Sequence, residues 1–158
     1  MIKYLIMDVD GTLTDGKIYM SSNGEMFKAF DIKDGCGIKD ILPCYGIIPI
    51  IITARESKIL ENRCKELSIE KLYQSERNKI GRLQEILLEE NADLSNCAYI
   101  GDDILDIQCM IPINEAGGKI GCPADAVKKV KDLADFISSK NGGDGAVREF
   151  IEWLVDGE

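Results

Sequence analysis

Short apolar runs of strand length alternate with segments of helical period along most of this chain, and this alternation is the feature that most constrains its fold. The strand-like runs span residues 4–9, 47–52, 71–73, 97–100, 119–121 and 134–137. The helical segments span residues 37–45, 57–67, 79–90, 105–111, 124–131 and 145–155. Strands that alternate with helices pair in parallel, so the pattern predicts an α/β protein with a doubly wound, mainly parallel sheet of the Rossmann-like kind.

One segment interrupts this alternation directly after the first strand. Residues 17–20 and 26–32 are two extended runs, and residues 21–25 between them contain the turn-forming pair Asn23 and Gly24. We therefore expect an inserted β-hairpin over residues 17–32. With 158 residues and 45% hydrophobic content, the chain is expected to form a single domain over residues 1–158, which ends in a glycine-containing tail and a last helix at 141–158.

The composition excludes several classes of chemistry. The chain has no histidine, and its six cysteines include no C-x-x-C pair, so a zinc site and imidazole catalysis are not expected. Acid/base chemistry must then come mainly from carboxylates, with lysine, tyrosine and cysteine as the other candidates. A net charge of −9 argues against nucleic-acid binding, although a metal ion and local cations could still admit a small anionic substrate. No apolar run is long enough to span a membrane, and a cytoplasmic location is expected.

Polar side chains follow four of the expected strands. In a doubly wound sheet, ligands bind at the carboxyl ends of the strands, where these side chains would meet. They are Asp8 and Asp10 after the first strand, Thr53 after the second, Lys79 at the start of the helix after the third, and Asp102, Asp103 and Asp106 after the fourth.

Carboxylates, a hydroxyl and an ammonium are the groups that phosphoryl transfer to a carboxylate requires. One carboxylate attacks phosphorus, and a hard divalent cation held by oxygen ligands offsets the repulsion between the two anions. The hydroxyl and the ammonium hold the remaining phosphate oxygens. A second carboxylic acid protonates the leaving oxygen and then activates water.

The residues at these strand ends resemble the signature motifs of the haloacid dehalogenase (HAD) superfamily. They are DVDGTLT over residues 8–14, then Thr53, Lys79 and finally GDDILD over residues 101–106, in the order of that family. The resemblance implies a phosphatase, because the second aspartate marks the phosphoryl-transfer members. It identifies Asp8 as the nucleophile and Asp10 as the general acid/base.

The same resemblance implies roles for the neighbouring residues. Gly11, Thr53, Ala54 and Lys79 would bind phosphate, and Mg²⁺ would be held by Asp8, Asp10 and Asp102. Asp103 would orient Lys79 or assist the metal, and Asp106 would either stabilise its helix or take part in catalysis. The intervals between these motifs are too short for a cap domain, which is typical of members that act on large substrates or close their site with a neighbouring subunit.

Three further segments resemble the 3-deoxy-D-manno-octulosonate 8-phosphate (KDO 8-phosphate) phosphatase group: DGKIY over residues 15–19, KAFDIKDG over 28–35 and GGDGAVRE over 142–149. This resemblance implies a small phosphosugar substrate and a homotetramer in which hairpins associate and the tail can reach a neighbouring site. The expected substrate contacts are Arg55, Lys33, Asp34 and Arg148. Arg55 could pair with the substrate carboxylate or change the charge of the pocket, Lys33 and Asp34 could instead form an ion pair at the hairpin end, and Arg148 could be a surface residue of the last helix.

Three alternatives stay open at this point. Close relatives of the group act on nine-carbon keto-sugar acid 9-phosphates, and Arg55 favours the eight-carbon substrate because this position tends to be acidic in the nine-carbon branch. A receiver-type signalling module also gathers aspartates, a threonine and a lysine at strand ends, but it needs no inserted hairpin. The third alternative is a noncatalytic subunit that binds a partner such as a sugar-activating cytidylyltransferase.

Overall fold

The computed structural model describes residues 1–156 and contains a six-stranded sheet in which all neighbouring strands are parallel. The strand order is β5-β4-β1-β6-β7-β8, so the first strand of the chain lies at the centre. The strands are β1 (Tyr4–Met7), β4 (Ile48–Ile52), β5 (Lys71–Tyr73), β6 (Cys97–Ile100), β7 (Lys119–Cys122) and β8 (Phe136–Ile137). This order confirms the predicted doubly wound α/β fold.

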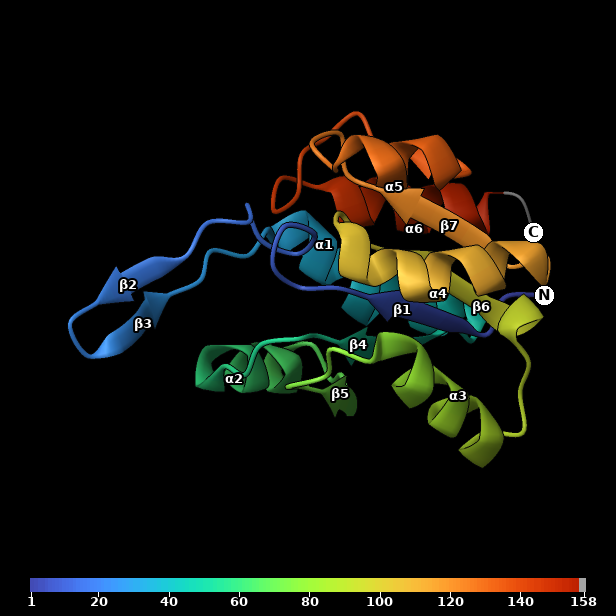
Figure 1. The fold of residues 1–158 in the computed structure, drawn as a ribbon, viewed down its shortest axis with the longest axis horizontal. Coiled ribbons are helices and arrows are strands. Elements are labelled where there is room, and N and C mark those ends of the chain that lie inside the picture. Colours follow the sequence, from blue (N-terminus) through green and yellow to red (C-terminus); the bar gives the residue numbers. More distant parts are fainter. Residues whose placement is uncertain (157–158) are drawn as a thin grey trace.

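Helices cover both faces of the sheet (Figure 1). One face carries α1 (Ile32–Cys36), α2 (Lys58–Glu66) and α6 (Ala146–Val155), and the other carries α3 (Lys79–Glu89), α4 (Ile104–Glu115) and α5 (Lys128–Leu133). Because side chains alternate along a strand, Leu5 and Met7 of β1 enter the first layer of core while Tyr4 and Ile6 enter the second. The central strands are therefore apolar at every position, as buried parallel strands must be.

The inserted hairpin is present as a separate antiparallel pair, β2 (Tyr19–Ser21) and β3 (Gly24–Phe27), which projects from the body of the protein (Figure 1). Its turn is tighter than predicted, because Ser21 pairs with Gly24 and only Ser22 and Asn23 lie between the strands. Gly24 has a φ of +107°, a conformation that glycine adopts without strain. The extended run also ends earlier than predicted, because Asp31 caps α1 with its side chain and Ile32 begins that helix.

Three helical segments differ from the sequence prediction, one in its helix type and two by more than one residue in their bounds. Residues 37–45 form a π-helical turn, η1 (Gly37–Ile41), and then a 3₁₀ turn, η2 (Leu42–Tyr45). A further 3₁₀ turn, η3 (Leu94–Asn96), precedes β6. Helix α4 continues through Pro112 to Glu115, and α5 begins at Lys128 because residues 124–127 form a turn.

The segment before α6 packs against the loop that follows β1. Gly143 N donates to the Thr12 carbonyl over 3.1 Å, and a side chain at Gly142 would come within 1.9 Å of the Gly11 carbonyl oxygen. Only glycine fits there. The last two residues of the predicted tail at 141–158 lie outside the described residues. Among the helices of residues 1–156, none combines the length and the apolar character needed to cross a membrane.

Candidate active site

Asp8 lies directly beyond the end of the central strand. Its backbone N–H donates to the Ile100 carbonyl of β6 over 3.1 Å, which continues the sheet pairing by one residue. The chain then turns sharply, because the N–H groups of Thr12, Leu13 and Thr14 all donate to the Val9 carbonyl at 2.9–3.1 Å. This turn leaves Asp8 buried at the floor of the site, with 8% of its surface exposed.

Lys79 is a buried ammonium that binds two carboxylates. It is the first residue of α3, a helix capped by the Asn78 side chain, and only 2% of Lys79 is exposed. Its Nζ lies 2.8 Å from Asp8 Oδ1 and 2.8 Å from Asp106 Oδ1. Burial by itself lowers the pKa of Lys79, but the contacts with Asp8 and Asp106 outweigh it, and the pKa is raised above its ordinary value. Lys79 therefore stays cationic beside Asp8.

Asp106, rather than Asp103, is the residue that orients Lys79. Besides the lysine, the Asp106 carboxylate accepts hydrogen bonds from Tyr99 Oη at 2.6 Å and from the backbone N–H groups of Asp102 and Asp103 at 2.9 and 3.1 Å. Asp103 is exposed, and its Oδ1 accepts from Ile104 N at the start of α4. The expected contact between Asp103 and Lys79 is thus corrected: Asp103 caps a helix, and Asp106 holds the lysine.

The carboxylates of Asp8, Asp102 and Asp106 converge, with one oxygen of each lying within 4.8 Å of the others. Burial, and then repulsion by Asp106, raises the pKa of Asp8 to about 6 despite the contact with Lys79. Burial together with repulsion by Asp8 and Asp106 raises the pKa of Asp102 to about 8. Carboxylates held this close together repel one another when they are ionised. A hard divalent cation such as Mg²⁺, which prefers oxygen ligands, would offset this repulsion. Because Asp106 is already fully hydrogen-bonded, Asp8 and Asp102 are the side chains available to the ion.

Gly11 leaves the space in which the Asp102 carboxylate lies. Its φ is +91°, and a Cβ at this position would come within 2.0 Å of Asp102 Oδ2. Thr12 Oγ1 donates to Asp102 Oδ1 over 3.0 Å and fixes the same carboxylate from the other side. Gly11 therefore serves first to admit Asp102 beside Asp8, whereas the sequence indicated a contact with phosphate.

A cavity opens above Asp8 and collects most of the predicted phosphate site. Thr53 and Ala54 follow β4 into it, and the buried Thr53 is held by a backbone hydrogen bond of 3.0 Å to the Tyr73 carbonyl. Arg77 also lines the cavity although no motif includes it, and so does Leu105, which lies in the 101–106 motif but had no expected role. The residues that line it are Asp8, Asp10, Thr53, Ala54, Arg55, Arg77, Lys79, Asp103, Ile104, Leu105 and Asp106.

Two hairpin residues, Lys28 and Glu25, reach the same site, and neither was expected there from the sequence. Lys28 Nζ lies 2.7 Å from Asp10 Oδ1 and 3.2 Å from Glu25 Oε2. Glu25 also accepts from Ser57 Oγ at 2.5 Å and lies 3.5 Å from Arg55 Nη2. Burial raises the pKa of Glu25, but the hydrogen bonds from Ser57 and Lys28 and the positive charges of Lys28 and Arg55 prevail and lower it overall. Lys28 opens the segment KAFDIKDG, so the motif was visible while its contact was not.

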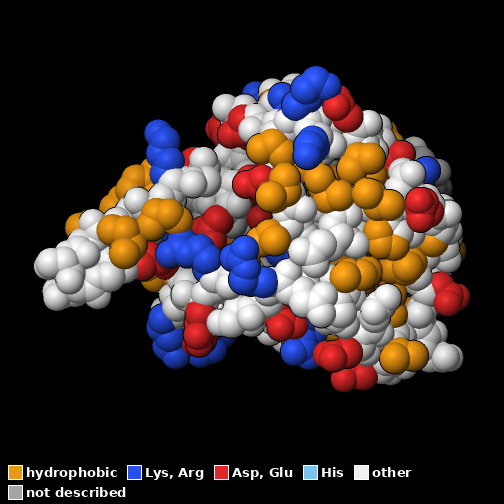
Figure 2. Space-filling view, viewed as in Figure 1, with side chains coloured by type: hydrophobic (Ala, Val, Ile, Leu, Met, Phe, Trp, Pro, Cys, Tyr) orange, Lys and Arg blue, Asp and Glu red, His pale blue; other side chains and the backbone are white. Residues whose placement is uncertain are grey.

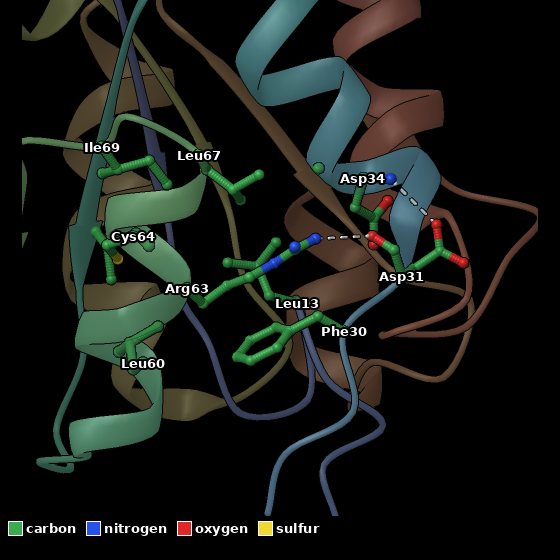
Figure 3. A pocket seen from close by; sticks show the side chains of 11 residues that line it. Leu13, Phe30, Asp31, Asp34, Leu60, Arg63, Cys64, Leu67 and Ile69 are labelled. Carbon is green, nitrogen blue, oxygen red and sulfur yellow. Dashed lines mark hydrogen bonds between the residues drawn. The ribbon is translucent and has the colours of Figure 1, made fainter.

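Three of the expected substrate contacts lie away from this cavity within the chain. Asp34 is 1% exposed, and its Oδ1 accepts from Arg148 N over 2.8 Å at the start of α6. Arg148 itself donates to Glu152 at 2.6 Å and to the Lys33 carbonyl at 3.4 Å. Figure 3 shows Asp34 in α1, facing α2 across a small apolar cavity. The structure therefore places Asp34 and Arg148 where α1 and α6 pack, leaves Lys33 exposed, and puts none of the three at the cavity above Asp8 of the same chain.

The chain is similar to proteins of known sequence over nearly its full length. It is 42% identical over 154 residues to the 3-deoxy-D-manno-octulosonate 8-phosphate phosphatase KdsC of Escherichia coli strain K12, an alignment that covers 98% of this chain and 79% of the relative. No protein-family model matches the chain.

Solved structures share its fold. The phosphatase of Moraxella catarrhalis, determined with a magnesium ion, a phosphate ion and KDO, has a TM-score of 0.91 and 37% identity, and the match covers 99% of this chain and 87% of that one. A HAD-superfamily hydrolase of Legionella pneumophila has a TM-score of 0.91 and 32% identity, over 98% of this chain and 82% of that one.

The parallel sheet, the aspartates beyond β1 and the buried Lys79 define a phosphatase of the HAD type, in which a carboxylate and an ammonium face a common cavity. At 42% identity over 98% of its length, the chain belongs to the 3-deoxy-D-manno-octulosonate 8-phosphate phosphatase family of that superfamily.

Proposed function

We propose that this protein is a Mg²⁺-dependent phosphatase that hydrolyses KDO 8-phosphate to KDO and phosphate, the activity numbered EC 3.1.3.45. The observation that carries the proposal is the buried contact of 2.8 Å between Lys79 Nζ and Asp8 Oδ1 at the floor of the cavity. A lysine fixed beside a carboxylate can offset the repulsion between that carboxylate and an approaching phosphate. Family membership speaks against the receiver-type module and against a noncatalytic subunit.

In the first half of the reaction, a carboxylate oxygen of Asp8 attacks phosphorus, and the bond between phosphorus and the sugar oxygen breaks. Lys79, together with the Thr53 hydroxyl and the backbone around Ala54, would bind the phosphate oxygens that do not react. Asp10 lies two residues further along the chain, on the same side as Asp8, and would donate a proton to the leaving sugar oxygen. The product of this step is an aspartyl phosphate on Asp8 and a free sugar alcohol.

In the second half, Asp10 would accept a proton from a water molecule, which attacks the same phosphorus and releases inorganic phosphate. Asp10 can act as a base in this step because it gave up its proton in the first step. Asp8 then returns to its starting state.

The fit of Mg²⁺ to this site rests on Asp8 and Asp102, whose carboxylate oxygens lie within 4.8 Å of each other and whose pKa values are raised first by burial and then by neighbouring carboxylates. The Asp10 backbone carbonyl completes the expected ligands. When bound, the ion would offset the negative charge shared by the attacking carboxylate and the phosphate.

Arg55 favours an eight-carbon keto-sugar acid, because the family resemblance implies an acidic residue at this position in the nine-carbon branch. Its side chain is 40% exposed and lies at the cavity, with Nη2 held by Glu25 at 3.5 Å. The other terminal nitrogen, Nη1, is buried without a hydrogen-bond partner among the described residues. This nitrogen lies 3.9 Å from Asp10 Oδ2, and the exposed part of the Arg55 side chain could pair with a substrate carboxylate.

The proposal also includes a homotetrameric assembly and a cytoplasmic location. The hairpin exposes Ile18, Met20, Met26 and Phe27 on a projecting arm, and Figure 2 shows apolar side chains along that arm. Four copies that associate through their hairpins, as the family resemblance implies, would bury this surface and bring a second chain to each site. A cytoplasmic location fits a phosphatase that works on a phosphorylated sugar intermediate.

Phosphate release from KDO 8-phosphate and from nine-carbon keto-sugar acid 9-phosphates tests the substrate directly. We expect Mg²⁺-dependent turnover with a clear preference for the eight-carbon compound, and a preference for a nine-carbon compound would refute this assignment.

The Asp8→Asn variant tests the mechanism, because it should abolish both turnover and the acid-labile phosphoenzyme, while Asp10→Asn should slow both half-reactions. Near-wild-type turnover by Asp8→Asn would exclude Asp8 as the nucleophile.

A further inference from the structure

Lys28 of the inserted hairpin is buried, and its ammonium pairs with two carboxylates at the active site. Only 5% of the Lys28 side chain is exposed, and its ammonium binds Asp10 Oδ1 at 2.7 Å and Glu25 Oε2 at 3.2 Å. A buried cation is stable only when it is paired and hydrogen-bonded, so these two carboxylates fix the position of the ammonium. The position of the Lys28 ammonium is therefore fixed by Asp10 and Glu25, and this ammonium does not move freely in solvent.

Glu25 extends this contact to the body of the protein. It accepts from Ser57 Oγ, the residue that caps α2, at 2.5 Å. Arg55 Nη2 lies 3.5 Å from the same carboxylate. The arm made by β2 and β3 is thus fastened beside the cavity through Glu25, and Lys28 is held between Glu25 and Asp10. Figure 2 shows acidic and basic side chains gathered where this arm joins the body.

The two oxygens of Asp10 are not equivalent in this arrangement. Oδ1 accepts from Lys28, whereas Oδ2 has no hydrogen-bond partner in the part of the chain that the structure describes, and its nearest cation is Arg55 Nη1 at 3.9 Å. An oxygen that is already occupied cannot easily exchange a proton with a substrate or with water. A carboxylate anchored through one oxygen presents the other in a fixed direction.

We propose that Lys28 is a positioning residue for proton transfer: it anchors Asp10 through Oδ1, so that Oδ2 is the oxygen that exchanges a proton with the leaving group and with water. The inserted hairpin then contributes to the chemical step itself. This inference rests on the proposed function in one respect, that Asp10 acts as the general acid/base.

The leaving group provides the test. Release of an alkoxide from a sugar phosphate needs a proton from the acid, whereas release of p-nitrophenolate does not. Single-turnover release of alcohol from KDO 8-phosphate should fall about tenfold to a hundredfold in Lys28→Met, the range expected when a general acid is misplaced. Single-turnover release of p-nitrophenol from p-nitrophenyl phosphate should stay within about twofold, because its leaving group draws nothing from the general acid. Equal losses with both substrates would overturn the inference.

A double-mutant cycle separates positioning from direct substrate binding. In an Asp10→Asn background, Lys28→Met should cost almost nothing further if the lysine acts through Asp10, whereas losses that add would mean that Lys28 binds substrate itself and would overturn the inference. Lys28→Gln, which keeps a hydrogen-bond donor, should recover part of the rate and replaces Lys28→Met if that variant does not fold. Lys17→Met, at an exposed lysine of the same segment, is the matched control and should behave as wild type.

A wrong substrate assignment can be distinguished from a wrong role for Lys28. If wild-type protein does not turn over KDO 8-phosphate, that assignment is wrong, and the inference is decided with phenyl phosphate against p-nitrophenyl phosphate. A larger loss of phenyl phosphate turnover in Lys28→Met would still support it, and equal losses would overturn it.

Discussion

Replacing Asp106 by asparagine tests whether the buried charge network below the cavity holds the site together. The Asp106 carboxylate is 1% exposed and accepts four hydrogen bonds: from Lys79, from Tyr99 and from two backbone N–H groups. An asparagine of the same shape has one carbonyl oxygen, so its NH₂ group must face either the lysine and the tyrosine or the two backbone donors. Donors then oppose donors on one side, and Lys79 keeps only Asp8 as a charged partner.

The expected loss of stability is about 3 kcal/mol. Removing one partner of a buried ion pair costs about 3–5 kcal/mol, and the lower end applies because Asp8 still pairs with the lysine. Urea unfolding followed by circular dichroism in EDTA measures this loss without a contribution from metal. With a slope of about 2 kcal/mol per molar urea, the midpoint should fall by ~1.5 M.

Asp103→Asn is the matched control for this experiment. Asp103 is exposed at the start of the same helix, and asparagine is an equally good capping residue, so stability should change by less than about 0.5 kcal/mol. A loss below about 1 kcal/mol in Asp106→Asn would refute the view that Asp106 balances the charge of Lys79.

Three further predictions follow from particular contacts. Burial raises the pKa of Asp34 from 3.8 to about 6, so the folded state binds more protons than the unfolded one between these values, and stability falls as pH rises through that window. Asp34→Asn should flatten this slope in urea titrations at several pH values, and an unchanged slope would contradict the assignment. Saturating Mg²⁺ should raise the Tm of the wild type by roughly 5–10 °C, a shift that Asp102→Asn should lose and whose persistence would exclude Asp102 as a ligand. Gly11→Ala should also lose the Mg²⁺ shift, because its Cβ would displace Asp102, whereas Gly24→Ala has a comparable positive φ with open space around it and should keep the shift while losing about 1 kcal/mol of stability. Equal Mg²⁺ responses in the two glycine variants would refute the steric explanation.

Local signals in the sequence predicted the architecture well. The apolar runs became the strands, because side chains buried on both faces leave no polar positions in a parallel sheet. The Asn-Gly pair placed the hairpin, although the turn is tighter than expected because residues 21 and 24 pair with each other. Helix bounds were less certain, since Pro112 lies inside α4 and did not end it.

The sequence also placed the residues that stand at strand ends, but not their partners. Asp8, Thr53 and Lys79 meet at one cavity because the carboxyl ends of parallel strands share one edge. Nothing local distinguished Asp103 from Asp106 as the partner of Lys79, because both follow β6 and only one of them turns inward at the start of α4.

What the sequence determined by itself is therefore the α/β fold and the set of groups at the strand ends, because both follow from short-range periodicity and from the rule that strand ends converge. Tertiary structure decided which groups touch. It placed Asp34 beneath α6, far along the chain from the helix that it caps, and it brought Lys28 from the hairpin to Asp10. Such contacts depend on how separate elements pack, and the sequence pattern within either segment does not show which residues of the other segment it will meet.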